Sequence, residues 1–296
     1  MGAFTVSFDF ELGWGALETG LWKMREKKGI YTGLRPVIER ITKLLDDLEI
    51  SVTWATVGAM IDNPCDEDFE YLPEPFQHSL KEFLRAGEQQ SRDGRDLLEM
   101  ILSMSTRQDI GSHSYSHTRF QVKNFTDEAK TIEMSKSITA LRNFDVDPKS
   151  FVFPVNQVAS FNVLEASGIS VARTPPPMPS TVAGKIVERS RGYTPTAKRT
   201  LQEGQLSIES GSMLYYWGLK RDWFLRRELI RQQIRTGLRK AANSNHHLHL
   251  WLHPFNLVEI PHLEAGLSEV FIKAAKLRDA EKLDIRPMSD PNKCYV

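Results

Sequence analysis

The sequence predicts an α/β protein whose parallel strands form a closed or nearly closed barrel. Short apolar segments with strand patterning alternate with longer amphipathic segments along the chain, and this alternation is typical of parallel sheets. About eight strand-like segments fit into the 296 residues, a normal length for one α/β barrel. The chain shows no internal repeat and no long low-complexity segment, so we expect one domain over residues 1–296.

The first half of the chain begins with a buried strand. Residues Ala3–Asp9 are rich in aromatic and β-branched side chains, which favour strands. Apolar residues then recur at helical spacing over Leu34–Leu48, and their broad face predicts an amphipathic helix. The same reasoning predicts a strand over Ile50–Val57, a helix around residues 76–84 and a short strand over Asp109–Ser112.

The second half continues the alternation of helices and strands. A helix is expected from about residue 127 to residue 144, and a long, Arg-rich helix from 223 to about 241. Short strands are predicted over Ser150–Phe153, Ile169–Arg173 and Gln205–Glu209. The remaining predicted elements are a strand over His247–His253, a helix over Leu263–Leu277 and a last strand over Leu283–Arg286.

Two segments are expected to be loops. The basic run Lys23–Lys28 is short and is interrupted by Glu26, which predicts a solvated loop. The proline-rich stretch Pro175–Pro179 predicts a rigid loop, and the segment from there to about Gly204 could cover a site on the barrel.

Composition narrows the class of protein. Lys and Arg together number 38, as do Asp and Glu, so the net charge is zero and nothing in it indicates a nucleic-acid partner. Cys65 and Cys294 lie far apart, which favours free thiols over a disulfide or a metal site. No apolar stretch approaches the roughly 20 residues of a membrane span. The N-terminus lacks the pattern of a secretory signal, so we expect a cytoplasmic protein.

Polar side chains with metal-binding chemistry stand at the ends of three predicted strands. Asp9 and Glu11 end the first strand, His113 and His117 follow the strand that ends at Ser112, and His253 ends a strand near the C-terminus. Because the active sites of α/β barrels lie at the carboxyl ends of the strands, we expect these groups to meet. Three histidines and two carboxylates are typical of a hydrolytic metal centre that keeps one position open for water.

Each feature alone has a simpler explanation. The acidic pair could be an ordinary strand end, and His113 and His117 could be a pair on a helix surface, although an i,i+4 pair can also face one metal. His247 and His249 share a strand face with His253 and could form a second metal site. Because they lie deeper or at the opposite mouth, a core-lining or surface position is favoured for them.

Five segments resemble, in order, the motifs of the polysaccharide deacetylase or NodB-homology family, also called carbohydrate esterase family 4. His113–His117 matches the family's His-Ser/Thr-x-x-His motif residue for residue, and Ser7–Glu11 resembles its first motif. Phe151–Gln157 is similar to the third motif, Leu250–Asn256 to the last motif, and Val52–Gly58 to the second strand. The resemblance extends from about residue 4 to about residue 257.

The resemblance implies a distorted (β/α) barrel with seven or eight mostly parallel strands. It also implies a metal-dependent hydrolase that removes an N-acetyl group from a sugar, in the synthesis of a polysaccharide or glycolipid. Glu11, His113 and His117 would hold a divalent metal ion, with zinc expected. Asp9 would be the general base that activates water, and His253 the general acid that protonates the leaving amine. The expected partner is an N-acetylated sugar or a related small amide.

The first motif departs from the usual pattern of the family. Many members have two adjacent aspartates there, a base followed by a metal ligand. In this chain Phe10 occupies the second of these positions. Glu11, one residue later, could be the ligand, and Asp9 could also take that place.

The third motif lacks the arginine that usually orients the catalytic aspartate, because Val152 and Val155 stand where it is expected. Either Arg119 or Arg173 substitutes for it, or the activity is weakened or lost. Two other functions therefore stay open: a hydrolase of a linear or cyclic non-sugar amide, and a homologue that binds a metal or a saccharide without turnover.

Overall fold

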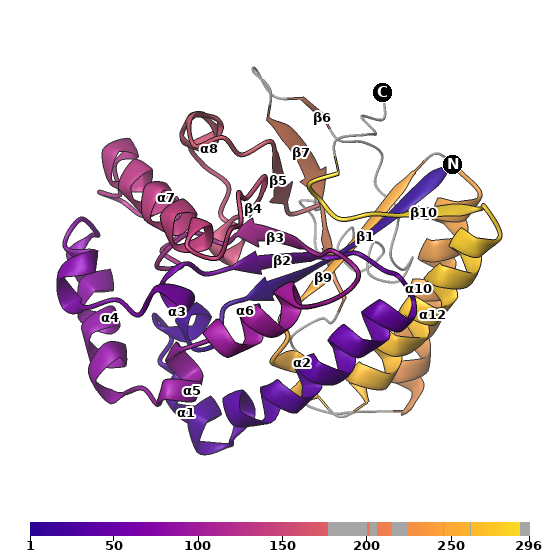
Figure 1. Ribbon diagram of the computed structural model, residues 1–296, viewed down its shortest axis with the longest axis horizontal. Coiled ribbons are helices and arrows are strands. Elements are labelled where there is room, and N and C mark those ends of the chain that lie inside the picture. Colours follow the sequence, from indigo (N-terminus) through magenta and orange to yellow (C-terminus); the bar gives the residue numbers. More distant parts are fainter. Residues whose placement is uncertain (177–199, 202–205, 215–223, 245, 261, 291–296) are drawn as a thin grey trace.

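The computed structural model describes residues 1–176, 200–201, 206–214, 224–244, 246–260 and 262–290. Its centre is a sheet surrounded by helices (Figure 1). Eight strands follow the order β7-β5-β4-β3-β2-β1-β9-β8, each parallel to its neighbours. They are β1 (Gly2–Phe10), β2 (Thr53–Thr56), β3 (Asp109–Ser112), β4 (Ser150–Val152), β5 (Val171–Thr174), β7 (Ser207–Ser210), β8 (Ser212–Met213) and β9 (His247–Leu252).

The two ends of this order belong to one short segment, which nearly closes the barrel. Only Gly211 separates β7, which pairs with β5, from β8, which pairs with β9. A side chain at Gly211 would collide with the barrel interior, because a Cβ atom there would lie 2.8 Å from Cδ of Arg173. The nearly closed parallel barrel expected from the sequence is thereby confirmed.

Helices pack around the barrel (Figure 1). They are α1 (Leu21–Lys27), α2 (Ile30–Asp47), α3 (Ala59–Asp62), α4 (Glu74–Ala86), α5 (Gln89–Arg92), α6 (Arg95–Leu102), α7 (Asp127–Arg142), α8 (Phe161–Ala166), α10 (Phe224–Ala242), α11 (Asn256–Glu259) and α12 (Leu263–Asp279). Short 3-10 turns cover Trp14–Ala16, Asp66–Phe69 and Pro154–Asn156. No helix in the described part of the chain is long and apolar enough to cross a lipid bilayer.

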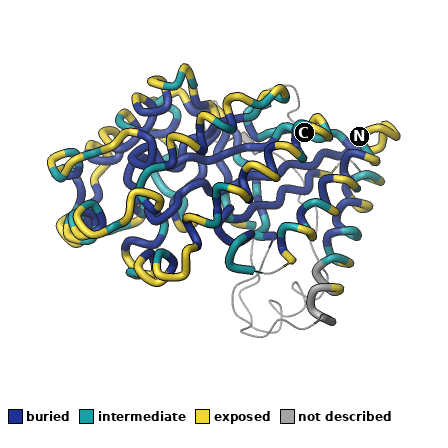
Figure 2. The backbone as a smooth tube through the Cα atoms, turned by 60° about the horizontal axis from the view of Figure 1, so that its bottom comes forward, coloured by how far each residue is buried: buried dark blue, intermediate teal, exposed yellow. Residues whose placement is uncertain are grey.

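The core is centred on β1. All nine residues of this strand are buried, and it has three neighbours because β10 (Leu283–Ile285) joins β2 and β9 beside it. Phe8 in β1 is fully buried and stacks on Trp54 of β2 with 4.3 Å between the ring centroids. Buried backbone runs through the middle of the molecule and exposed residues lie on its outer elements (Figure 2).

Most predicted elements are confirmed to within a few residues, and β3 agrees with its prediction at both ends. The predicted set of strands needs correction. The last predicted strand, β10, pairs only with the start of β1 and lies off the barrel path. The antiparallel strand β6 (Thr200–Leu201) beside β7 was not predicted. Most of the loop expected to begin at Pro175 lies outside the described residues.

The expectation of a solvated loop over Lys23–Lys28 is wrong. Most of this run belongs to α1, and Arg25 is buried. Its Nε donates to Oε1 of Glu259 at 2.8 Å, and its guanidinium carbon lies 3.9 Å from the ring centroid of Phe255. An arginine can be buried when its charge is paired and its plane stacks on an aromatic ring. Both partners are more than 200 residues away in the chain, so the local charge pattern did not reveal them.

The packing of β1 generates a first prediction. Replacing Phe8 by alanine removes the stack on Trp54 and leaves a cavity in a site that is fully buried. We expect the free energy of unfolding to fall by about 3–5 kcal/mol, measured by denaturant titration. Ile132→Ala is the control, since Ile132 on α7 is 43% exposed and its loss should change stability by no more than about 0.5 kcal/mol. Equal effects of the two substitutions would contradict this description of the core.

Candidate active site

Strand register brings the predicted site residues to one mouth of the barrel. In β1 and β9, Phe8 pairs with Leu252, so Asp9 and His253 are level on neighbouring strands. Phe10 pairs with Thr56 of β2, and Thr56 pairs with Ser112 of β3. Glu11 and His113 therefore leave the sheet at the same level, two strands apart, roughly 10 Å between backbones. Side chains that point inward can span that gap.

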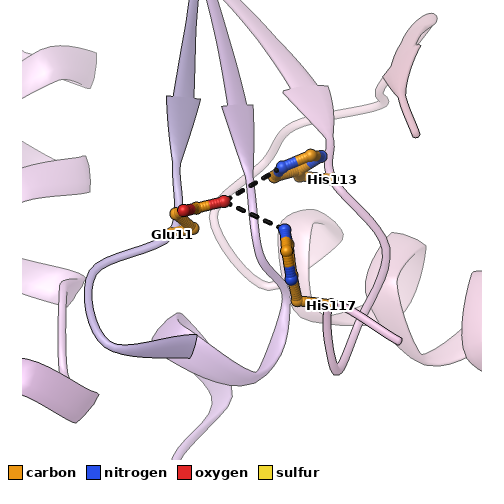
Figure 3. A group of neighbouring side chains, drawn as sticks. All are labelled: Glu11, His113 and His117. Atoms are coloured by element: carbon orange, nitrogen blue, oxygen red, sulfur yellow. Dashed lines mark ion pairs between the residues drawn. The ribbon is translucent and has the colours of Figure 1, made fainter. Parts of the chain in front are cut away.

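Glu11, His113 and His117 converge on one point (Figure 3). Oε2 of Glu11 lies 3.3 Å from Nε2 of His113 and 2.9 Å from Nε2 of His117. The three side chains are buried, and one potential ligand atom from each lies within 4.8 Å of the others. Among the described residues this is the one group of three or more His, Cys, Asp or Glu side chains with such spacing.

The donor atoms fit a divalent metal ion. Oε2 of Glu11 and Nε2 of His113 are buried and make no hydrogen bond of good geometry within the described part of the chain. Buried polar atoms of this kind are costly unless a partner satisfies them. One carboxylate oxygen and two imidazole nitrogens are a ligand set typical of zinc, with room for a fourth ligand.

His113 is held in the tautomer that a metal ligand needs. Its Nδ1 lies 2.7 Å from the carbonyl oxygen of Val152, which can only accept a hydrogen bond. Nδ1 therefore carries the proton, and the lone pair of Nε2 faces Glu11. Burial lowers the pKa of His113, which favours the neutral ring. The next strand, β4, thus orients a side chain of the His113–His117 loop.

Glu133 of α7 supports the loop that carries both histidines. Its Oε1 accepts hydrogen bonds from the backbone N–H groups of Tyr115, at 2.9 Å, and Ser116, at 2.7 Å. It also accepts from the hydroxyl groups of Ser116 and Tyr71. These bonds stabilise a loop in which His117 has a φ of 62°, a costly value for a residue other than glycine. Sequence reasoning missed Glu133, although an acidic residue beside the apolar stripe of a helix was a signal.

Asp9 is bound by Arg173 through two parallel contacts. Nη1 of Arg173 lies 2.5 Å from Oδ1 of Asp9, and Nη2 lies 2.7 Å from Oδ2. Both side chains are buried. Burial alone would raise the pKa of Asp9, but the charge and hydrogen bonds of Arg173 outweigh it and hold the pKa below its usual value. Of the two arginines that could replace the missing one, Arg173 therefore contacts Asp9.

A strained turn after β4 holds Arg173 from the other side. Oδ1 of Asn156 accepts a hydrogen bond from Nη2 of Arg173 at 3.2 Å. Asn156 and Val155 both have a φ of 54°, which is unusual for Asn and strongly disfavoured for a β-branched residue. Such conformations cost about 1–3 kcal/mol each and persist where surrounding contacts enforce them. The valine at the expected arginine position is thus part of a turn that supports the substitute arginine.

His253 lies against both carboxylates. Its Nε2 is 3.4 Å from Oε1 of Glu11 and 4.0 Å from Oδ2 of Asp9, and 19% of its side chain is exposed. Its ring stacks on Phe255 with 4.9 Å between centroids and an interplanar angle of 17°. Nδ1 of His253 is buried and has no hydrogen-bond partner within the described residues. Aromatic stacking therefore orients this ring, and Phe255 and the Arg25 that covers it were missed from sequence.

The pKa of Glu11 differs from that of an ordinary buried carboxylic acid. Burial alone would raise its pKa, but the charges of His253 and His117 outweigh it and hold the pKa well below its usual value. Glu11 is therefore an anion at neutral pH. A side chain at Gly15 would displace it, because a Cβ atom there would lie 1.9 Å from Oε1 of Glu11.

His247 and His249 are buried in the barrel interior, below Asp9, as the core-lining alternative predicted. Nε2 of His249 lies 2.8 Å from Oγ of Ser7, which accepts a hydrogen bond from Nη1 of Arg173 at 2.9 Å. Nδ1 of His249 lies 2.8 Å from Oε1 of Glu209. Sequence reasoning placed Glu209 at a strand end without assigning it a contact. This interior network fills the barrel beneath the site with paired polar groups.

Comparison with known proteins finds solved structures that are similar to this one. No family model and no curated protein sequence matches the chain. A solved structure described as a polysaccharide deacetylase from Mycobacterium smegmatis has a TM-score of 0.61 and 16% identity, over 97% of this chain and 87% of that one. Puue allantoinase has a TM-score of 0.57 and 14% identity, over 96% and 87%. A structure described as a polysaccharide deacetylase from Pseudomonas aeruginosa PAO1 has a TM-score of 0.51 and 13% identity, over 96% and 87%.

At these identities the likeness concerns the fold. It extends over nearly the whole chain in all three comparisons. The motifs that resemble the deacetylases and the structural comparison thus agree, and the chain has the fold of the polysaccharide deacetylases.

Proposed function

We propose that this protein is a metal-dependent amide hydrolase that removes the N-acetyl group of a sugar. The observation that carries the proposal is the buried group of Glu11, His113 and His117 directly beside the Asp9–Arg173 pair and His253. A ligand set, a base and an acid then lie within one mouth of the barrel. Two of the similar structures are described as polysaccharide deacetylases, which supports the choice of substrate.

Glu11, His113 and His117 would hold the ion, which we propose to be zinc. Bound there, zinc would acidify a water molecule and polarise the amide carbonyl. The chain contributes the geometry that makes this useful. Val152 fixes the ring of His113, and Glu133 fixes the loop, so the two histidine donors are placed before any ion or substrate arrives.

Asp9 would act as the general base. The low pKa that Arg173 imposes keeps the carboxylate ionised at neutral pH, so Asp9 can accept the proton of the attacking water. Arg173 also fixes the orientation of the carboxylate by contacting both of its oxygens, and a fixed acceptor avoids reorganisation during the reaction. The third motif lacks the usual arginine, and for that reason a homologue without turnover was considered. Arg173 supplies an arginine to Asp9 from another strand, and this supports catalysis.

His253 would act as the general acid. Its Nε2 reaches both carboxylates from the neighbouring strand and is partly open to solvent. A substrate nitrogen bound in the mouth would then meet a donor on the side opposite the His113–His117 loop. Protonation of that nitrogen allows the amine to leave.

A second candidate substrate is a linear or cyclic amide that is not a sugar, because Puue allantoinase is also similar in structure. Acetate release from N-acetylglucosamine and its oligomers, measured beside hydrolysis of allantoin and simple acetamides, distinguishes the two. Turnover confined to the non-sugar amides would overturn the sugar assignment and leave the hydrolase.

The metal generates the next prediction. His113→Ala should abolish tight zinc binding, because two remaining protein ligands seldom hold zinc. We expect about one zinc per chain in the parent protein and almost none in the variant, measured by elemental analysis after dialysis. His78→Ala, at an exposed position on α4, is the control and should keep its zinc. Full occupancy in a variant lacking both His113 and His117 would refute this centre.

The two carboxylates should separate in function. Asp9→Asn should keep the metal and lose turnover, because the amide of asparagine cannot accept the proton. Glu11→Gln should lower metal affinity, because it replaces the anionic ligand. Zinc content and acetate release are measured on both variants, with circular dichroism to verify folding. Loss of zinc in Asp9→Asn and its retention in Glu11→Gln would mean that Asp9 is the ligand.

His253 can be tested as an acid apart from its packing. His253→Phe keeps an aromatic ring to stack on Phe255 but carries no proton to donate. We expect turnover to fall by roughly 100- to 10,000-fold in both His253→Phe and His253→Ala, with little change in zinc content. A packing histidine would behave differently: His253→Phe would retain near-normal specific activity, and only His253→Ala would lower the melting temperature.

A further inference from the structure

A small pocket opens beside the metal-site residue His117. Its volume is about 190 Å³. The turn after β1, the helix α4 and the end of the His113–His117 loop form its walls, and Val155 from the strained turn closes one side. No role has been assigned to this space so far, although it shares a wall with the proposed active site.

Arg119 and Glu18 form a charged pair on the wall of this pocket. Nε of Arg119 donates to Oε1 of Glu18 at 2.9 Å, and Nη2 lies 2.5 Å from Oε2. The two side chains are 35% and 32% exposed, so their outer edges remain accessible. Arg119 is the arginine that does not contact Asp9. It pairs with Glu18 at the pocket instead, so a separate role can be sought for it there.

The pair presents both donors and acceptors but no net charge. A guanidinium has five N–H donors, of which Glu18 takes two, and the carboxylate keeps unused lone pairs. Neighbouring hydroxyl groups of a sugar ring are donors and acceptors at once, and they match such a planar edge. An anionic ligand would instead have to compete with Glu18 for Arg119.

Apolar side chains line much of the remaining wall, next to the polar residues Thr19, Ser79, Ser116, His117 and Thr118. Phe76 has its ring centroid 5.9 Å from the guanidinium carbon of Arg119, and Leu17 and Leu80 line the same pocket. The indole N–H of Trp14 already donates to the carbonyl of Arg92 at 2.8 Å, so it needs no ligand. Apolar walls with a few placed polar groups are typical of small-molecule sites, and they suit the C–H face of a pyranose.

Val155 is the least expected part of the wall. It is a β-branched residue with a φ of 54°, and 57% of it is exposed. Its strained backbone and its exposed side chain do not stabilise the fold at this position. Strained residues of this kind cluster at ligand sites. The turn that holds Asn156 against Arg173 also projects Val155 to the pocket, so one turn serves both places.

We propose that this pocket is a subsite for one sugar ring of the substrate, with Glu18 and Arg119 recognising adjacent hydroxyl groups. The proposal rests on the proposed function, since it assigns the ring to the substrate of the neighbouring centre. At about 190 Å³ the pocket is smaller than the roughly 300–1,000 Å³ occupied by drug-sized ligands. It therefore encloses a single ring, and further units of a longer saccharide would lie outside it.

Binding can be measured without turnover by using the deacetylated sugar, which has no amide bond to hydrolyse. The zinc-loaded protein is titrated with glucosamine by calorimetry, as are the variants Arg119→Met and Glu18→Gln. We expect the Kd to rise by about 10- to 100-fold in Arg119→Met, the usual effect of losing hydrogen bonds to a charged group. Arg40→Met is the matched control, because Arg40 forms the same two-contact pair with Glu264 on an exposed surface. Its Kd should equal that of the parent protein.

Glu18→Gln keeps the size of the side chain. It therefore tests the pocket even if Arg119→Met fails to fold. Weaker binding in both pocket variants, with unchanged zinc content, supports the subsite. Saturable binding of equal strength in Arg119→Met and the parent protein overturns it, as does the absence of saturable binding to the parent.

Acetate release measured on the same samples keeps the two proposals apart. A raised KM for the N-acetyl sugar in Arg119→Met, with kcat less affected, supports both. Acetate release with the parent KM in that variant overturns the subsite and leaves the hydrolase. Sugar binding that depends on Arg119 in a parent protein that hydrolyses no amide overturns the hydrolase and leaves the subsite.

Discussion

Two buried carboxylates at the end of one strand impose the constraint on which the site depends. Asp9 and Glu11 are each 3% exposed, and an ionised carboxylate in such surroundings is tolerated only with a partner of opposite charge. Arg173 satisfies Asp9 with both of its terminal nitrogens. Glu11 has histidines on two sides and, within the described part of the chain, no ion pair with an arginine or lysine. This difference in partners, more than the difference in side chain, is the reason we propose Asp9 as the base and Glu11 as the metal ligand.

The sheet explains why the residues selected from the sequence lie close together in the structure. In a parallel barrel the carboxyl ends of all strands meet at one mouth, so locating the strands also located Asp9, Glu11, His113, His117 and His253. The register of the strands adds to this, because paired residues bring the ends of β1, β2, β3 and β9 to the same level. Local pattern and strand order were sufficient for residues that stand at strand ends.

Residues that act from elsewhere could not be predicted in the same way. Arg173 was one of two candidates, and only the face of β5 that it occupies decides in its favour. Glu133 is inside a helix, and its contacts with the His113–His117 loop depend on how α7 packs on the barrel. Arg25 was assigned to solvent because a short basic run usually is solvated. Its partner Glu259 lies 234 residues away, beyond the reach of any local pattern.

The turn after β1 connects Glu11, the proposed metal ligand, to the proposed sugar subsite. Glu11 begins this turn, Gly15 packs against its carboxylate, and Glu18 follows three residues later to face Arg119. Leu12, next to Glu11, has a φ of 44°, so the chain leaves the strand in a conformation that few residues adopt. Any side chain at Gly15 would overlap with Glu11, and relief of that overlap must move either the ligand or the turn. The position of the Glu11 carboxylate and the position of the charged pair in the pocket are therefore set by the same few residues. A substrate ring seated against Glu18 would meet a proposed metal ligand whose place is fixed by the same backbone.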